Sequence, residues 1–178
     1  MLSTLRNAWK VPELRKRFLW TIFLVAIFRI GIHIPVPGID TSALSTLTES
    51  GGLLSFYNLI SGGAFTKASI LALSVSPYIN ASIIMQLLTI AIPSLEQLSK
   101  EGEEGRKKIQ SITRYVSIGI ACVLALGVYS TIANLGATSG VGTLEKIVII
   151  FSLVVGSTFC MWLGDQITSK GVGNGISV

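Results

Sequence analysis

Charged residues are scarce in this 178-residue chain. Lys, Arg, Asp and Glu together make up 13% of it, whereas soluble domains average about 25%. Hydrophobic residues make up 50%, and the mean hydropathy is +0.68. This shortage of charge excludes an ordinary water-soluble domain and indicates that lipid is the solvent. The net charge of +5 does not point to nucleic acid, because the charges cluster between apolar runs, as they do in membrane proteins.

Side chains that carry out chemistry are also few. Cysteine occurs only as Cys122 and Cys160, which lie in separate apolar runs without a CxxC motif or a Cys/His cluster. We interpret both as packing residues. His33 is the single histidine and is interpreted as an interfacial residue. With no nucleophile–base pair, carboxylate pair or metal set, the sequence predicts no enzyme, no metal site and no cofactor.

Long apolar runs dominate what is present. We predict an all-α polytopic membrane protein whose helices cross the bilayer at residues 18–34, 68–93, 109–135 and 146–167, each long enough to span it. The connecting segments are a cytoplasmic amino-terminal segment at 1–17, an external loop at 35–67, a cytoplasmic loop at 94–108, an external loop at 136–145, and a cytoplasmic turn with the start of a fifth helix at 168–178.

The basic residues orient these helices. Ten Lys and Arg residues lie before the first run or around the segment between the second and third, against two in the external loops. The positive-inside rule therefore places the amino terminus in the cytoplasm. The chain stops at "KGVGNGISV", just as a new apolar segment begins. We therefore expect it to be a portion of a longer protein.

A short apolar stretch interrupts the external loop. "LLSFYNLISGGAF" begins at Leu53 and is broken at Ser61-Gly62-Gly63. Twelve helical residues reach only about 18 Å, against about 30 Å of hydrocarbon, so the stretch cannot cross. Irregular backbone at membrane depth must be buried in protein or face water. We therefore predict a half-helix that fills an external cavity, and a kink or a restart of the next helix at Pro77.

Three polar features of the sequence have two interpretations each. Arg29 near the outer end of the first helix either reaches the interface or makes a polar contact inside a bundle. The charged segment "EGEEGRKK" is either a solvated hairpin tip or a docking surface for a soluble partner. Helical spacing puts Val75, Ile79 and Gln86 on one face with Ser82 and Ile83, and that face either packs on another helix or lines a pore or a separable seam.

Several stretches, in order, resemble the SecY family of protein-conducting channels. They are "FRIGIHIPVPGID", "NLISGGAFTKASI", "SPYINASIIMQLL", "EGEEGRKKIQSITRY" and "MWLGDQITSKGVGNGIS". The resemblance implies the amino-terminal half of a ten-helix inverted-repeat channel, with four complete membrane helices, a plug half-helix and the start of a fifth helix. One departure concerns the residues before "PYI", where the family commonly has glycine and this chain has Ser74-Val75-Ser76.

The resemblance also implies roles for particular residues. The plug covers about residues 52–64, and its named members are Leu53, Leu54, Phe56, Tyr57, Asn58, Leu59, Ile60, Ser61, Gly62 and Gly63. Val75 and Ile79 map to the apolar pore ring. Asn80, Ile83 and Gln86 map to the lateral gate, which opens sideways toward lipid. A ring of branched apolar side chains would exclude water and ions by dewetting.

The implied function is passage of unfolded preproteins across the bacterial inner membrane, with sideways release of hydrophobic segments into lipid. The implied partners are SecE-like and SecG-like membrane subunits, a SecA-type motor ATPase or a ribosome, preproteins with their signal sequences, and membrane lipid, but no nucleic acid directly. An alternative is a secondary transporter or ion channel with a broken helix. That alternative favours a charge near the bilayer midplane, whereas Asp165 falls at the cytoplasmic end of its run and is interpreted as an interfacial charge.

Overall fold

The computed structural model describes residues 11–39, 41, 44–45, 53–134 and 142–175. Within these residues the regular elements are helices, and no strand is present, which confirms the predicted all-α class. The helices are α2 (Pro12–Gly31), α4 (Leu53–Ile60), α5 (Ser76–Ala91), α6 (Pro93–Lys100), α7 (Glu103–Asn134) and α8 (Thr143–Lys170). The expected start of a fifth membrane helix at residues 176–178 lies outside the described residues.

The described helices differ in their suitability to cross a membrane. Helices α7 and α8 are long and apolar enough by themselves, and α5 with α6 would count as a third span across a bend of 100°. Helix α2 extends further toward the amino terminus than predicted, since Pro12 suits the first turn of a helix. It therefore includes Arg15, Lys16 and Arg17 in addition to Arg29, and these charges lower its apolar character.

The second predicted helix begins later than its apolar run suggests. The run starts at Ala68, but residues 61–75 form successive turns and α5 begins at Ser76, with Pro77 in its first turn. Proline has no N–H to donate and fits only this end of a helix. Ala68 and Ser74 adopt φ angles of +47° and +50°, which a helix cannot accommodate. The predicted helix at 68–93 is thus wrong at its start, whereas the restart predicted at Pro77 is confirmed.

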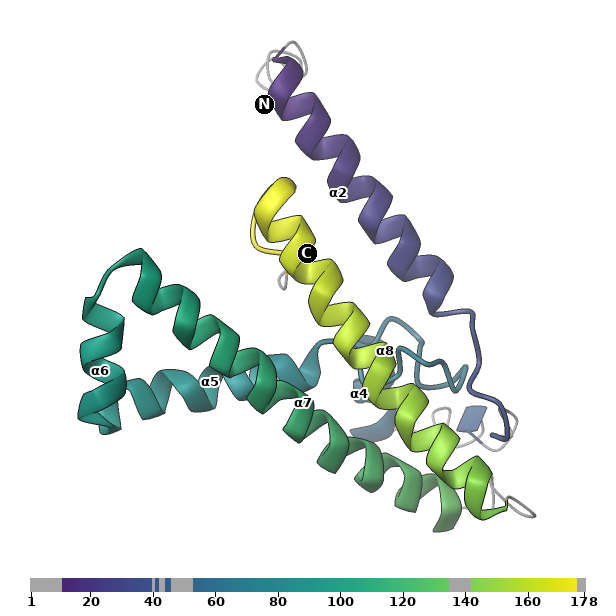
Figure 1. Cartoon of the computed structure of the whole chain (residues 1–178). Coiled ribbons are helices and arrows are strands. Elements are labelled where there is room, and N and C mark those ends of the chain that lie inside the picture. The colour runs from purple at the N-terminus through teal and green to yellow at the C-terminus, as the bar shows by residue number, and fades with distance from the viewer. Residues whose placement is uncertain (1–10, 40, 42–43, 46–52, 135–141, 176–178) are drawn as a thin grey trace.

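The predicted cytoplasmic loop at 94–108 is also more ordered than expected. It contains α6 and the first turn of α7, so that α5, α6 and α7 form a bent hairpin (Figure 1). The amino-terminal part of α7 extends away from α8 with α5 and α6, and its later part packs against α8. Proline favours an extended conformation of the residue before it. Ile92 is extended accordingly, and α6 begins at Pro93. The third and fourth predicted helices, 109–135 and 146–167, correspond to α7 and α8, each with an additional turn at its charged end.

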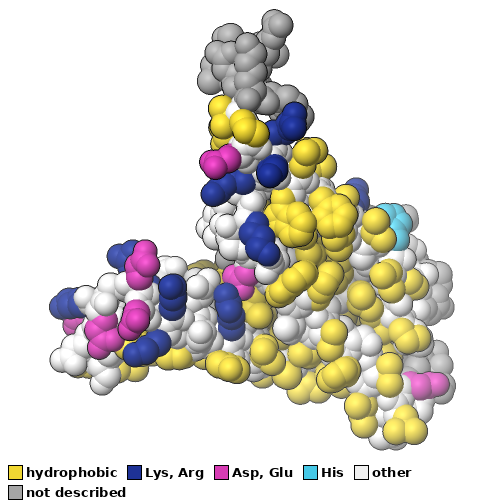
Figure 2. Space-filling model, turned by 45° about the horizontal axis from the view of Figure 1, so that its top comes forward, with side chains coloured by type: hydrophobic (Ala, Val, Ile, Leu, Met, Phe, Trp, Pro, Cys, Tyr) yellow, Lys and Arg dark blue, Asp and Glu magenta, His cyan; other side chains and the backbone are white. Residues whose placement is uncertain are grey.

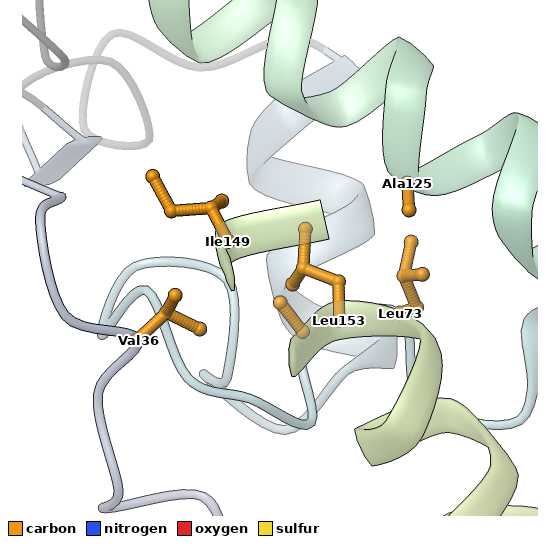
Figure 3. Packing of buried hydrophobic residues seen from close by; sticks show 6 residues of the cluster. Val36, Leu73, Ala125, Ile149 and Leu153 are labelled. Carbon is orange, nitrogen blue, oxygen red and sulfur yellow. The ribbon is translucent and has the colours of Figure 1, made fainter. Parts of the chain in front are cut away.

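A buried apolar cluster joins α7, α8 and the turns before α5. Val36, Leu73, Ala125, Ile149 and Leu153 converge there from four segments of the chain (Figure 3). Helix α8 approaches the turns before α5 closely at Gly156, where an added Cβ would lie 1.8 Å from the carbonyl oxygen of Ile70. Hydrophobic side chains also remain exposed over much of the face that Figure 2 shows. Burial alone therefore does not account for the apolar composition.

The external loop is closed at its base by backbone hydrogen bonds. The N–H of Val36 donates to the carbonyl of Ala68 at 2.8 Å, and the N–H of Ile70 donates to the carbonyl of Ile34 at 3.1 Å. These bonds make an antiparallel bridge between Pro35 and Ser69. The ends of α2 and of the turns before α5 are thereby held together, and α4 lies within the loop that they close.

Candidate functional site

The short helix α4 occupies most of the predicted plug. It runs from Leu53 to Ile60, which at about 1.5 Å per residue is about 12 Å and too short to cross a bilayer. Gly62 and Gly63 follow with φ angles of +65° and +86°, a backbone conformation that glycine adopts without strain. The predicted break at Ser61-Gly62-Gly63 is therefore present. Gly52, at the predicted start of the plug, lies outside the described residues.

Polar contacts of Asn58 fix the carboxyl end of α4. Its backbone carbonyl accepts the N–H of Gly63 at 2.9 Å and the hydroxyl of Ser61 at 3.1 Å. Its side-chain oxygen accepts the N–H of Thr66 at 3.0 Å. Phe56 and Leu59, in contrast, are 64% and 76% exposed. These hydrogen bonds therefore hold the carboxyl end of the helix, whereas Phe56 and Leu59 contribute little burial.

Arg29 makes a polar contact with the turn after α4. Its Nη1 donates to the carbonyl oxygen of Gly62 at 3.3 Å, at an exposed position, so α2 contacts the turn that follows α4. A cation beside the carboxyl end of a helix is favourably placed relative to the helix dipole. Nothing in the sequence pairs these residues, because they are far apart along the chain and the contact depends on the tertiary fold.

The two predicted ring residues lie at the start of α5. Val75 is the residue before the helix, and the N–H of Ile79 donates to its carbonyl at 3.1 Å, so they stand one turn apart on the same face. Val75 packs against a buried cluster that contains Ile32, Leu71 and Ala64, and Ile79 is 40% exposed. Because Ala64 lies at the end of the predicted plug segment, that segment and a ring candidate pack in one apolar cluster.

The predicted gate residues share an exposed face of α5. Asn80, Ile83 and Gln86 are all exposed, whereas the opposite face buries Tyr78, Ala81 and Met85. The amide of Gln86 donates to the hydroxyl of Ser82, one turn earlier, at 3.4 Å. Within the described part of the chain, this stripe of apolar and polar residues is therefore open to a neighbour.

Next to this face lies a groove of about 470 Å³ between α5, α6 and α7. Its lining combines polar with apolar side chains and includes Gln86, Gln110, Arg106 and Met85. Gln86 therefore borders both the exposed face of α5 and this groove. The sequence did not predict the groove, because it depends on the bend between α5 and α6.

One ion pair joins α7 and α8 beneath α5. Arg114 Nη2 lies 2.9 Å from Asp165 Oδ2, with the side chain of Asp165 only 18% exposed. Asp165 was interpreted as an interfacial charge, and the structure adds Arg114 as its partner. Among described residues, no group of three or more His, Cys, Asp or Glu side chains could hold a metal ion. Cys160 is buried as a packing residue, whereas Cys122 is exposed.

Sequence comparison relates the chain to protein translocation channels. A model of the SecY family matches residues 69–178, which is more than half of the chain. Protein translocase subunit SecY of Escherichia coli (strain K12) is 44% identical over 172 residues, covering 93% of this chain and 39% of that protein. The Thermotoga maritima protein of the same name is 41% identical, covering all of this chain and 44% of its own length. The chain thus spans about two fifths of these curated relatives.

Solved structures agree at the level of the fold. Sec61 in the canine ribosome-channel complex from the endoplasmic reticulum matches with a TM-score of 0.62 and 22% identity, covering 97% of this chain and 39% of that one. A second match, with the same TM-score and identity, comes from a study in which the plug domain of SecY stabilises the closed state of the translocation channel. At this identity the likeness concerns the arrangement of helices.

Proposed function

The chain belongs to the SecY family, and from that premise we propose that it supplies the plug, part of the pore ring and one side of the lateral gate of a protein-conducting channel. The channel passes unfolded preproteins across the bacterial inner membrane and releases hydrophobic segments sideways into lipid. The amino terminus faces the cytoplasm, in keeping with the distribution of Lys and Arg. The role is one of conduction, without a catalytic step.

One observation carries this proposal. A helix too short to cross the membrane is followed by a segment that packs, through Ala64, in the same cluster as Val75 at the start of α5. A plug must lie next to the constriction that it closes, and this shared packing supports the assignment of both. Aliphatic contacts are weak and non-directional, so a constriction of branched side chains can yield to a polypeptide of any sequence.

The exposed stripe of α5 supports the lateral gate. Asn80, Ile83 and Gln86 face outward together, as expected of a seam that opens. A hydrophobic signal segment gains about 0.8 kcal/mol for each CH₂ that it transfers from water to lipid. Opening of the seam toward lipid would therefore favour release of apolar segments over retention.

The partners follow from the family. We propose SecE-like and SecG-like membrane subunits, and a SecA-type motor ATPase or a ribosome on the cytoplasmic face. The bent hairpin of α5, α6 and α7 carries exposed charged residues at its tip, including Glu101, Glu103 and Lys107, and Figure 2 shows charges of both signs gathered on one arm of the molecule. Such a tip suits a soluble partner better than lipid.

The ring assignment is tested by ion leak. Ile79→Ser in the channel that contains this chain should raise the resting ion current, because a hydroxyl in the constriction favours wetting. Ile84→Ser is the matched control, since Ile84 is similarly exposed but lies about 140° away around α5. An equal current for wild type, Ile79→Ser and Val75→Ser would refute the ring assignment.

A further inference from the structure

The end of α2 and the turn that follows it contact the segment after α4 at two points. Arg29, in the last turn of α2, donates to the carbonyl of Gly62 at 3.3 Å. His33, just beyond the end of α2, lies 2.8 Å from the ammonium nitrogen of Lys67 through Nε2. Gly62 and Lys67 both lie in the turns at residues 61–75, so this end of α2 holds those turns at two positions.

His33 makes a hydrogen bond through each of its ring nitrogens. A lysine ammonium can only donate, so Nε2 of His33 is the acceptor for Lys67. Nδ1 lies 3.0 Å from the backbone carbonyl oxygen of Arg29, which can only accept. Arg29 and His33 thus belong to one connected chain of hydrogen bonds that runs from Lys67 to Gly62.

We propose that Arg29, His33 and Lys67 act together as a plug latch: positioning residues that hold the carboxyl end of α4 closed and must release it when the channel opens. The proposal rests on the assignment of α4 as the plug. Phe56 and Leu59 of α4 are largely exposed, so these two side chains do little to hold the helix. The contacts of Arg29 and Lys67 are exposed hydrogen bonds, which are weak enough to be broken by a passing chain.

A labelling experiment measures how often α4 leaves its position. Ser61 is 2% exposed, so a cysteine placed there should react with a water-soluble maleimide only when the turn is displaced. The Ser61→Cys change is made in a background with Cys122→Ser and Cys160→Ala, in the membrane-inserted channel that contains this chain. Resting ion current is recorded for the same variants.

Substitution by methionine removes each donor while keeping a long side chain. Arg29→Met and Lys67→Met should each raise the rate of labelling at position 61 and the resting current by about two- to fivefold, the factor expected for a lost charge-assisted hydrogen bond at an exposed site. Arg29→Lys keeps a cation and should stay within about twofold of wild type. Lys146→Met is the matched control, because Lys146 is an exposed lysine at the amino end of α8.

The outcomes separate the latch from the channel assignment. If Arg29→Met and Lys67→Met behave like Lys146→Met, the latch does not exist, whatever the function. If Arg29→Lys leaks as much as Arg29→Met, a positioning role for the charge is refuted. A variant that lacks residues 53–60 tests the plug itself: if this deletion leaves the resting current unchanged, the proposed function fails, and with it the premise of the latch.

Discussion

The close approach of α8 to the turns before α5 gives the sharpest quantitative prediction. In Gly156→Ala the new methyl group would lie 1.8 Å from the carbonyl oxygen of Ile70 and 2.6 Å from its carbon. To regain an ordinary contact of 3.4 Å, the oxygen would have to move by about 1.6 Å. It cannot move freely, because the N–H of Ile70 is bonded to Ile34 and Leu73 lies in the buried cluster.

The expected cost follows from this geometry. Overpacking of a core costs about 1–3 kcal/mol, and because the obstacle is fixed backbone we expect the upper end, about 3 kcal/mol. Gly119→Ala and Gly127→Ala are matched controls on α7, where an added Cβ meets no atom within 4 Å. There the better helix propensity of alanine should add up to about 1 kcal/mol. The same substitution should therefore have opposite effects on the two helices.

Thermal unfolding of the detergent-solubilised channel measures the difference. Gly156→Ala should melt several degrees below wild type, and the two controls at or above it. If Gly156→Ala and Gly127→Ala melted together, the close contact between α8 and the turns before α5 would be wrong. The reasoning would also fail if Gly156→Ala melted low but Gly119→Ala melted equally low, because the effect would then not depend on the available space.

Three further predictions follow. Ser74→Gly should stabilise the protein by about 0.5–1 kcal/mol, because a φ of +50° strains any residue with a Cβ; a lower melting temperature than wild type would contradict it, and Ser74→Ala should show no gain. A double-mutant cycle with Arg114→Gln and Asp165→Asn should give a coupling energy of about 1 kcal/mol for a partly exposed pair, and zero coupling would exclude the ion pair. Asn58→Ala should raise the resting current by leaving the N–H of Thr66 without this acceptor, whereas Asn58→Asp keeps an acceptor; equal currents would argue against the contact.

The periodicity and the breaking residues of the sequence predicted much of the plug region. The shortness of the apolar stretch predicted a half-helix, and the glycines after Ser61 predicted its end, both from local chemistry. The run from Ala68 was misread as helix, because apolar turns packed in a core have the same composition as a membrane helix. In the structure, the positive φ angles at Ala68 and Ser74 reveal the difference. In the sequence, the available signal was the position before "PYI", where the family commonly has glycine.

Contacts between distant segments could not be predicted. The pairing of Arg114 with Asp165 depends on the register between α7 and α8, which periodicity does not determine. In the same way, the sequence could not predict that Arg29 donates a hydrogen bond to the carbonyl of Gly62. The gate and ring assignments rest on the resemblance to the family, and the structure adds the exposure of those residues and the contact at Val75.

The bridge between Pro35 and Ser69 limits how far a displaced plug can travel. Eight residues lie between Ile60, the end of α4, and Ser69, and a fully extended chain over this stretch reaches about 30 Å. If the bridge survives opening, α4 swings on a tether about as long as the hydrocarbon core is thick. It could then clear the path of a translocating chain without pulling on α5, and the same short tether would return it once the chain has passed.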